Sequence, residues 1–149
     1  MKNIFVETDA NEIINRIEKL SPSTPRLWGK MNVSQMLSHC GNALDMAMGT
    51  INPRRIFIGR IIGGLIKSKY VNEVPFSRSS PTSEEIKVTD ARDFVLEKAR
   101  LIRLIKQFSA NGEAGCTKHP HPFFGALTPS EWSRGMYKHL DHHIRQFGT

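Results

Sequence analysis

The stretch TPSEWSRGMYKHLDHHIRQF, residues 128–147, decides the fold. It contains the clearest helix start in the chain, because Thr128 is a preferred N-cap, Pro129 suits the first helical position and Glu131 completes a capping box. An apolar stripe through Trp132 and Met136 then follows one side of the predicted helix. The stretch therefore predicts an amphipathic helix that packs its apolar side against other helices.

Three earlier segments have the same helical periodicity, at about residues 9–20, 32–48 and 90–110. The first begins with Asp9 and Glu12, which resemble a capping box, and the second begins at Asn32, a good N-cap.

The segment between the second and third of these helices is long and irregular. Residues 56–69 could form one or two short helices, although three glycines lower the helix propensity there, and residues 72–85 predict a loop. No segment has a convincing strand pattern. We therefore predict an all-α fold, in which four main helices form a bundle with a long crossover connection and short extra helices, as a single domain over residues 1–149.

Composition and charge indicate a globular chain without an evident nucleic-acid motif. The formal net charge is +7, and much of the excess lies in residues 54–69. No series of aromatic residues alternates with these cations, so a solvated basic face is the favoured interpretation. The longest apolar run, residues 56–66, is too short to span a bilayer, and neither Cys40 nor Cys116 has a partner at a bridging spacing. We therefore expect a soluble, cytoplasmic protein.

The C-terminal helix also carries a histidine pair. His139 and His143 are four residues apart, so their rings project from one side of the helix, in line with Trp132. His39 lies at the border of the apolar side of the second helix. Facing side chains in a helical bundle build metal sites, and three neutral imidazoles leave a coordination position for water or substrate. The sequence predicts that His39, His139 and His143 bind one divalent ion, with zinc or nickel as the favoured metals.

Two alternatives stay open at this point. His142 is three residues from His139 and could replace His143 as a ligand. A lone histidine at a core border, such as His39, is also more often a hydrogen-bonded core residue than a ligand.

The loop that precedes the C-terminal helix contains Cys116, His119 and His121, which could bind a second ion. A structural zinc site needs four ligands, and this loop supplies three. We therefore predict that His119 and His121, together with Gln35 and His142, orient the metal ligands or the substrate.

Three stretches resemble a known group of proteins. WGKMNVSQMLSHC (28–40) and KHLDHHIRQFG (138–148) resemble the DinB-like (YfiT-like) superfamily of metalloenzymes. HPHPFFGALTPSEWSRGMYKHLDHH (119–143) resembles one bacterial branch of it, described only as a domain of unknown function. The resemblance covers nearly the whole chain.

This resemblance implies a four-helix bundle of the DinB-like type and a metal bound by His39, His139 and His143. Relatives include transferases and isomerases that use low-molecular-weight thiols, and others described as hydrolases. The closing run of the superfamily is His-Arg-Gly-Gln, whereas this chain has Ile144 and Arg145 between His143 and Gln146. The resemblance therefore implies no role for Arg145.

Three hypotheses of function follow. The first is a metal-dependent enzyme acting on a small-molecule substrate, by thiol-dependent S-transferase or isomerase-like chemistry or, as a second version, by hydrolysis. The second is a metal-binding module without catalysis, and the third is a nucleic-acid or membrane-surface binder that uses residues 54–69. We favour the first and predict no nucleic-acid partner and no membrane partner, while a homodimer stays open.

Overall fold

The computed structural model describes residues 2–78 and 84–149, and this part of the chain is all-helical, as predicted. Its α-helices and short 3₁₀ turns are α1 (Glu7–Glu18), α2 (Val33–Met48), α3 (Phe57–Val71), η1 (Glu84–Ile86), α4 (Phe94–Asn111), η2 (Gly112–Gly115) and α5 (Pro129–Gln146). The described residues contain no strand, and their one β-bridge joins His121 to Gly125.

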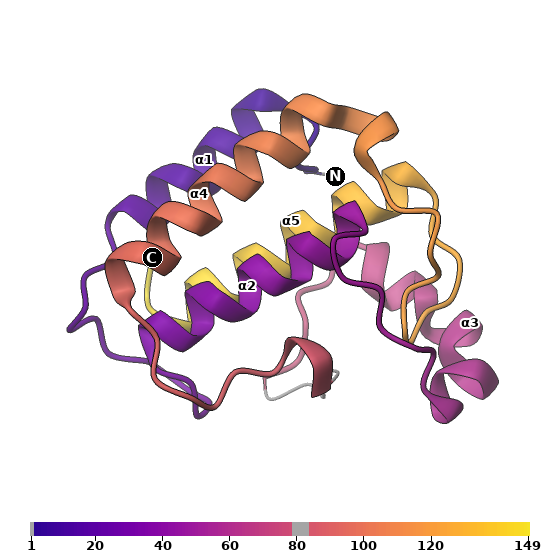
Figure 1. The fold of residues 1–149 in the computed structure, drawn as a ribbon, viewed down its shortest axis with the longest axis horizontal. Coiled ribbons are helices and arrows are strands. Elements are labelled where there is room, and N and C mark those ends of the chain that lie inside the picture. Colours follow the sequence, from indigo (N-terminus) through magenta and orange to yellow (C-terminus); the bar gives the residue numbers. More distant parts are fainter. Residues whose placement is uncertain (1, 79–83) are drawn as a thin grey trace.

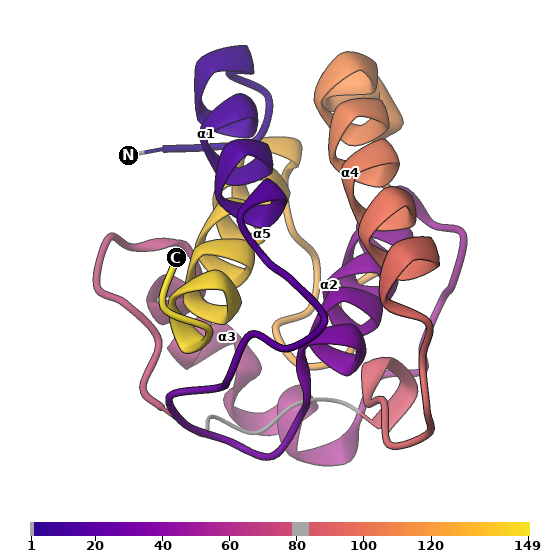
Figure 2. The ribbon, with the colours of Figure 1, turned by 90° about the vertical axis from the view of Figure 1, so that its left-hand side faces the viewer.

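Four of the helices enclose the core. In Figure 1, α1 lies beside α4 and α2 lies beside α5, and Figure 2 shows the same four helices from the side. Helix α4 packs on α1 and α2, and α5 closes the ring by packing on the same two helices. The largest fully buried side chains, Trp132 and Phe108, come from α5 and α4. Ion pairs from Arg100 to Asp45 and from Arg16 to Asp141 join neighbouring helices at the surface.

The two helices that carry the predicted ligands start where the sequence indicates. The Asn32 side chain accepts a hydrogen bond from the Gln35 backbone N–H, and the Gln35 side-chain oxygen accepts one from the Asn32 backbone N–H. Thr128 and Glu131 form the corresponding capping box of α5. These caps satisfy the free N–H groups of the first turn and fix the rotational phase of each helix, so the histidine rings point where the periodicity predicts.

Two other predicted starts are wrong by a few residues. Helix α1 begins at Glu7 without a side-chain cap, because the Asp9 carboxylate accepts a hydrogen bond from the Asn3 backbone N–H instead of capping the helix. Helix α4 begins at Phe94 rather than near residue 90, because the Asp93 side chain is the N-cap.

Helix α3 is a single helix that lies outside the ring, at the lower right of Figure 1. Its buried side consists of Gly59, Gly63 and Tyr70. A Cβ atom added at Gly63 would lie 1.9 Å from the Phe123 carbonyl oxygen, and one added at Gly135 of α5 would lie 2.0 Å from the Tyr70 ring. The glycines therefore allow close packing of α3 against the 119–125 loop and α5. No helix in the described ranges is long and apolar enough to cross a bilayer.

Candidate metal centre

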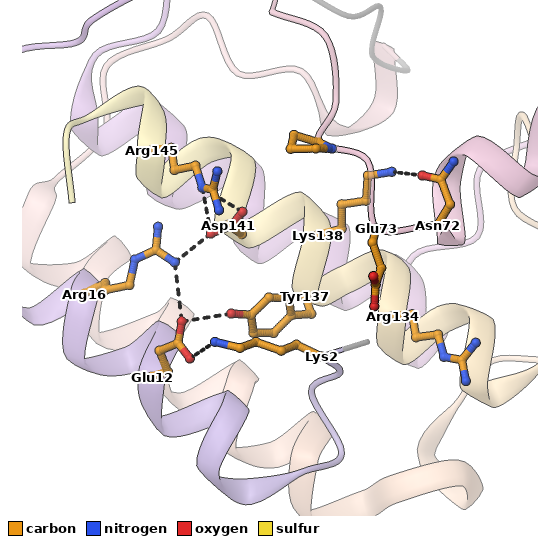
Figure 3. Close-up of a pocket in the computed structure, with 11 residues that line it drawn as sticks. Lys2, Glu12, Arg16, Asn72, Glu73, Arg134, Tyr137, Lys138, Asp141 and Arg145 are labelled. Carbon is orange, nitrogen blue, oxygen red and sulfur yellow. Dashed lines mark hydrogen bonds and ion pairs between the residues drawn. The ribbon is translucent and has the colours of Figure 1, made fainter.

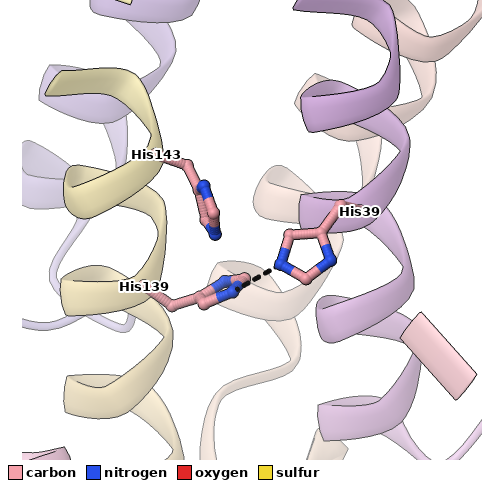
Figure 4. Close-up of side chains that lie close together, drawn as sticks. All are labelled: His39, His139 and His143. Atoms are coloured by element: carbon pink, nitrogen blue, oxygen red, sulfur yellow. Dashed lines mark hydrogen bonds between the residues drawn. The ribbon is translucent and has the colours of Figure 1, made fainter. Parts of the chain in front are cut away.

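The structure brings His39, His139 and His143 together between α2 and α5 (Figure 4). One ring nitrogen of each residue lies within 4.8 Å of the others, and the Nε2 atoms of His39 and His139 are 3.0 Å apart. Among the described residues, no other group of three such side chains could hold a metal ion. The predicted triad therefore forms a cluster with the geometry of a candidate metal site.

The tautomer of His39 follows from its hydrogen bond. The Nδ1–H group donates to the carbonyl oxygen of Ile86, at 2.8 Å, because a carbonyl can only accept. The lone pair of His39 is consequently on Nε2, the atom that faces His139. His39 is only 2% exposed, and burial lowers its pKa below the ordinary value.

The tautomer of His143 is fixed by a longer chain of hydrogen bonds. The Gln146 amide donates from Nε2 to the Trp28 carbonyl oxygen, at 2.7 Å, which turns its Oε1 toward His143. This oxygen accepts the Nδ1–H of His143 at 3.0 Å, so the lone pair of His143 is on Nε2. Burial, followed by the nearby His39, lowers the pKa of His143 to about 3. His143 is therefore held neutral and oriented by its neighbours, as metal-ligating histidines usually are.

His139 has the least support of the three. Its Nδ1 atom is buried and has no hydrogen-bond partner in the described part of the chain. Burial is the main reason that its pKa lies well below the ordinary value, and the neighbouring imidazoles lower it further. Two nitrogens that are 3.0 Å apart, as in His39 and His139, must share a proton or a cation, because facing lone pairs repel each other.

This donor set fits a divalent cation. Tetrahedral zinc with Zn–N distances of about 2.0–2.1 Å places its nitrogen ligands about 3.3 Å apart, close to the 3.0 Å between His39 and His139. The wider spacings, up to 4.8 Å, require a small rotation of the rings on binding. As whole residues, His139 and His143 are partly exposed, whereas His39 is buried.

His142, the alternative ligand, does not belong to the cluster. Its ring lies 5.9 Å from Trp28 and 5.8 Å from Phe76, measured between centroids, and 5.1 Å from His143. It lines a surface pocket of about 240 Å³ whose wall also includes Arg78 and Lys138. The structure thus places His142 beside the candidate metal centre and in contact with a cavity.

A second pocket, of about 360 Å³, adjoins the first and shares Pro75, Lys138, Asp141 and Arg145 with it. Figure 3 shows that side chains of α1 and α5 form its floor. The Tyr137 hydroxyl donates to the Glu12 carboxylate at 3.0 Å, and this bond contributes to raising the pKa of Tyr137 to about 12, after burial. The sequence gives no sign of this pocket, because the residues that line it are far apart in the chain.

Two of the remaining predicted site residues, Gln35 and His119, form hydrogen bonds with residues outside the cluster. The Gln35 amide completes the helix cap and donates to the carbonyl oxygens of Thr89 and Asp90. His119 Nε2–H donates to the carbonyl oxygen of Pro53 at 3.0 Å.

His121 is the loop histidine that packs into the protein. Its Nδ1 accepts hydrogen bonds from the backbone N–H groups of Phe123 and Phe124, and its ring is 5.5 Å from that of Trp132. Burial, followed by the charge of Arg55, lowers the pKa of His121 to about 3. These contacts indicate that His121 holds the loop in place.

Two groups that orient the ligands, the Gln146 side chain and the Ile86 carbonyl, are not among the residues predicted from the sequence. Gln146 stands in the motif KHLDHHIRQFG, three residues after His143, and this spacing places the two side chains on one side of a helix. This spacing in the sequence therefore indicates that Gln146 can contact His143. The Ile86 carbonyl left no signal, because a backbone oxygen 47 residues from His39 can be located only in the folded chain.

Comparison with known proteins identifies a family but no reaction. The model of a family described as "Protein of unknown function (DUF1569)" matches residues 5–149. Neither the curated proteins nor the solved structures include a significant match.

Proposed function

This chain belongs to the DUF1569 family of proteins of unknown function, and we propose that it is a metal-dependent enzyme that activates a thiol for transfer to, or isomerisation of, a small molecule. The observation that carries this proposal is the convergence of three neutral imidazoles from α2 and α5. Zinc or nickel are the favoured ions, because imidazole ligands suit both. The helix order and the origin of the three histidines also agree with the DinB-like four-helix bundle that the sequence resembles.

An open coordination shell favours catalysis over a purely structural metal. A structural zinc site has four protein ligands, whereas this cluster offers three, two of which are partly exposed. A divalent cation bound there would supply Lewis acidity, which lowers the pKa of a thiol or water that contacts it.

The chain's own residues would position the ligands and the substrate. The Ile86 carbonyl and the Gln146 amide hold two of the imidazoles with their lone pairs toward the cluster. The pocket that His142 lines lies next to His143, and Arg78, Lys138 and Arg145 give it cationic groups. We propose that a small molecule enters there and that His142 orients it. Cys40 and Cys116 are both free thiols, which supports a reducing compartment such as the cytoplasm.

Hydrolysis of a small substrate is the second version of this function, since the same cation would activate water as readily as a thiol. A metal-binding module without catalysis is the remaining alternative. It would require that neither thiol nor substrate reaches the bound ion.

The first test is the metal content of single variants, measured by elemental analysis after saturation with zinc or nickel and removal of excess ion. Wild type is expected to hold one ion per chain, and replacement of any member of the triad by alanine is expected to abolish tight binding. His142→Ala is the matched control, since it removes an adjacent imidazole outside the cluster. Full metal content in His139→Ala, or loss of metal in His142→Ala but not in His143→Ala, would refute the site.

A separate measurement tests the reaction class. Protein loaded with Co²⁺ is titrated with a small thiol, and a sulfur-to-metal absorption band is expected to grow to saturation. An unchanged spectrum in protein that binds the metal normally would exclude thiol activation while leaving the metal site intact. Circular dichroism of each variant should stay helical, because the apolar core does not depend on the ion.

A further inference from the structure

The outward side of α3 exposes a continuous row of large apolar side chains. Phe57, Ile61 and Leu65 are 78%, 60% and 81% exposed, and Ile58 beside them is 51% exposed. Their spacing of four residues aligns the first three along one side of the helix, because an α-helix turns about 100° per residue. Exposed apolar rows of this kind mark surfaces that bind a partner or a membrane.

This row lies directly opposite the side by which α3 is attached. Gly59, Gly63 and Tyr70 form the buried side, and on a helical wheel they point about 180° away from Ile61. In Figure 1, α3 projects from the ring of helices. The molecule therefore presents the apolar row at its outer edge.

Cations border the row on both sides. Arg60 and Lys69 are exposed and lie about 80–100° from Ile61 around the helix, on opposite sides of it, while Arg54 is exposed just before the helix begins. Residues 53–71 contain no Asp or Glu. Lys67 forms an ion pair with Glu131, but Arg54, Arg60 and Lys69 have no acidic partner in the described ranges.

The apolar row and its flanking cations together favour one kind of partner for α3. An apolar row flanked by cations without acidic partners matches the anionic headgroup layer of a bilayer, where the row enters the acyl boundary and the cations meet lipid phosphates and carboxylates. A second copy of this chain would bring like charges together across the contact, and a nucleic acid would leave the apolar row uncovered.

We propose that α3 is an interfacial helix that binds the surface of an anionic membrane through Phe57, Ile61 and Leu65, with Arg60 and Lys69 at the headgroups. The sequence alone favoured a solvated basic face and no membrane partner. The folded helix leads to a different inference, because it separates the apolar residues from the buried side and places them between the cations. This proposal does not depend on the metal centre.

The test is sedimentation of the full chain with vesicles of phosphatidylcholine, with or without phosphatidylserine. Binding is expected only to the vesicles that contain phosphatidylserine, and it should weaken as salt increases. The double variant Phe57→Ser/Leu65→Ser should bind at least about tenfold more weakly, since two large apolar side chains are removed from the contact. Val95→Ser/Leu96→Ser is the matched control, because those α4 side chains are 69% and 70% exposed and lie outside α3; it should bind as wild type does.

Charge is tested separately by Arg60→Gln/Lys69→Gln, for which we expect binding to be about tenfold weaker. Unchanged helical content and metal binding in the variants exclude misfolding as the cause. Failure to sediment with phosphatidylserine, or equal loss in the α3 and α4 variants, would overturn the proposal. So would concentration-dependent dimerisation that Phe57→Ser/Leu65→Ser abolishes, or tight DNA binding that this variant leaves unchanged.

Discussion

Gln146→Leu isolates the group that orients one metal ligand without removing the ligand itself. Gln146 is 3% exposed, and its amide connects the Trp28 carbonyl oxygen to Nδ1 of His143, with bonds of 2.7 and 3.0 Å. Leucine has a similar volume but can neither donate nor accept a hydrogen bond. The variant therefore keeps the packing and frees the His143 ring to rotate and to change tautomer.

The expected effect is a loss of metal affinity of about 10- to 100-fold, which is the usual consequence of removing a group that holds a ligating histidine. This range corresponds to about 1.4–2.7 kcal/mol of binding free energy. The free energy of unfolding of the metal-free protein should fall by about 1–3 kcal/mol as well, because the Trp28 carbonyl loses its donor.

The assay is competition for zinc or nickel with a chromophoric chelator at neutral pH. Gln107→Leu is the matched control, because Gln107 is exposed on α4 and its side-chain oxygen accepts a hydrogen bond from Arg103 at 3.4 Å, away from the histidine cluster. It should bind metal as wild type does. If Gln146→Leu binds within about twofold of wild type while His143→Ala does not bind, orientation of His143 by Gln146 contributes nothing and the reasoning is wrong.

Two further predictions concern stability. Burial lowers the pKa of both His121 and His143 to about 3, whereas in the unfolded chain each has its ordinary value near 6.5. Below about pH 6.5 the unfolded state therefore binds more protons than the folded state, and the free energy of unfolding falls as the pH is lowered. The metal-free protein should therefore lose about 2 kcal/mol per histidine between about pH 8 and pH 5, measured by urea unfolding; stability that does not fall would contradict the assigned burial. Gly63→Ala should destabilise by about 1–3 kcal/mol, because its Cβ would lie 1.9 Å from the Phe123 carbonyl oxygen. A Cβ at Gly64, on the same helix, meets nothing within 4 Å, so Gly64→Ala should be neutral or slightly stabilising in thermal unfolding; equal effects of the two variants would exclude close packing of α3 against the 119–125 loop.

Local chemistry explains which parts of this fold were predictable. The caps at Asn32 and Thr128 depend on residues three positions apart, so the starts of α2 and α5 follow from the sequence. Once those starts are fixed, helical periodicity gives the directions of His39, His139 and His143.

Long-range contacts explain the rest. The glycines of α3 reduce helix propensity, yet the helix forms because Gly59 and Gly63 allow contact with the Phe123 backbone. Phe123 lies 60 residues after Gly63 in the chain. Asp9 resembles a helix N-cap in the sequence, but its carboxylate accepts a hydrogen bond from the Asn3 backbone N–H instead. A tertiary partner outweighs the local preference in both cases.

The position of the histidine cluster between α2 and α5 has a consequence for the lifetime of the protein. His39 and His139 are 100 residues apart in sequence, so a cation that bridges them would cross-link two distant parts of the chain. At a free concentration 1,000 times its dissociation constant, such an ion adds about 4 kcal/mol to the stability of the folded state. Proteases that cleave transiently opened molecules would then find about a thousandfold fewer of them. The cellular abundance of the protein would rise and fall with the supply of the metal.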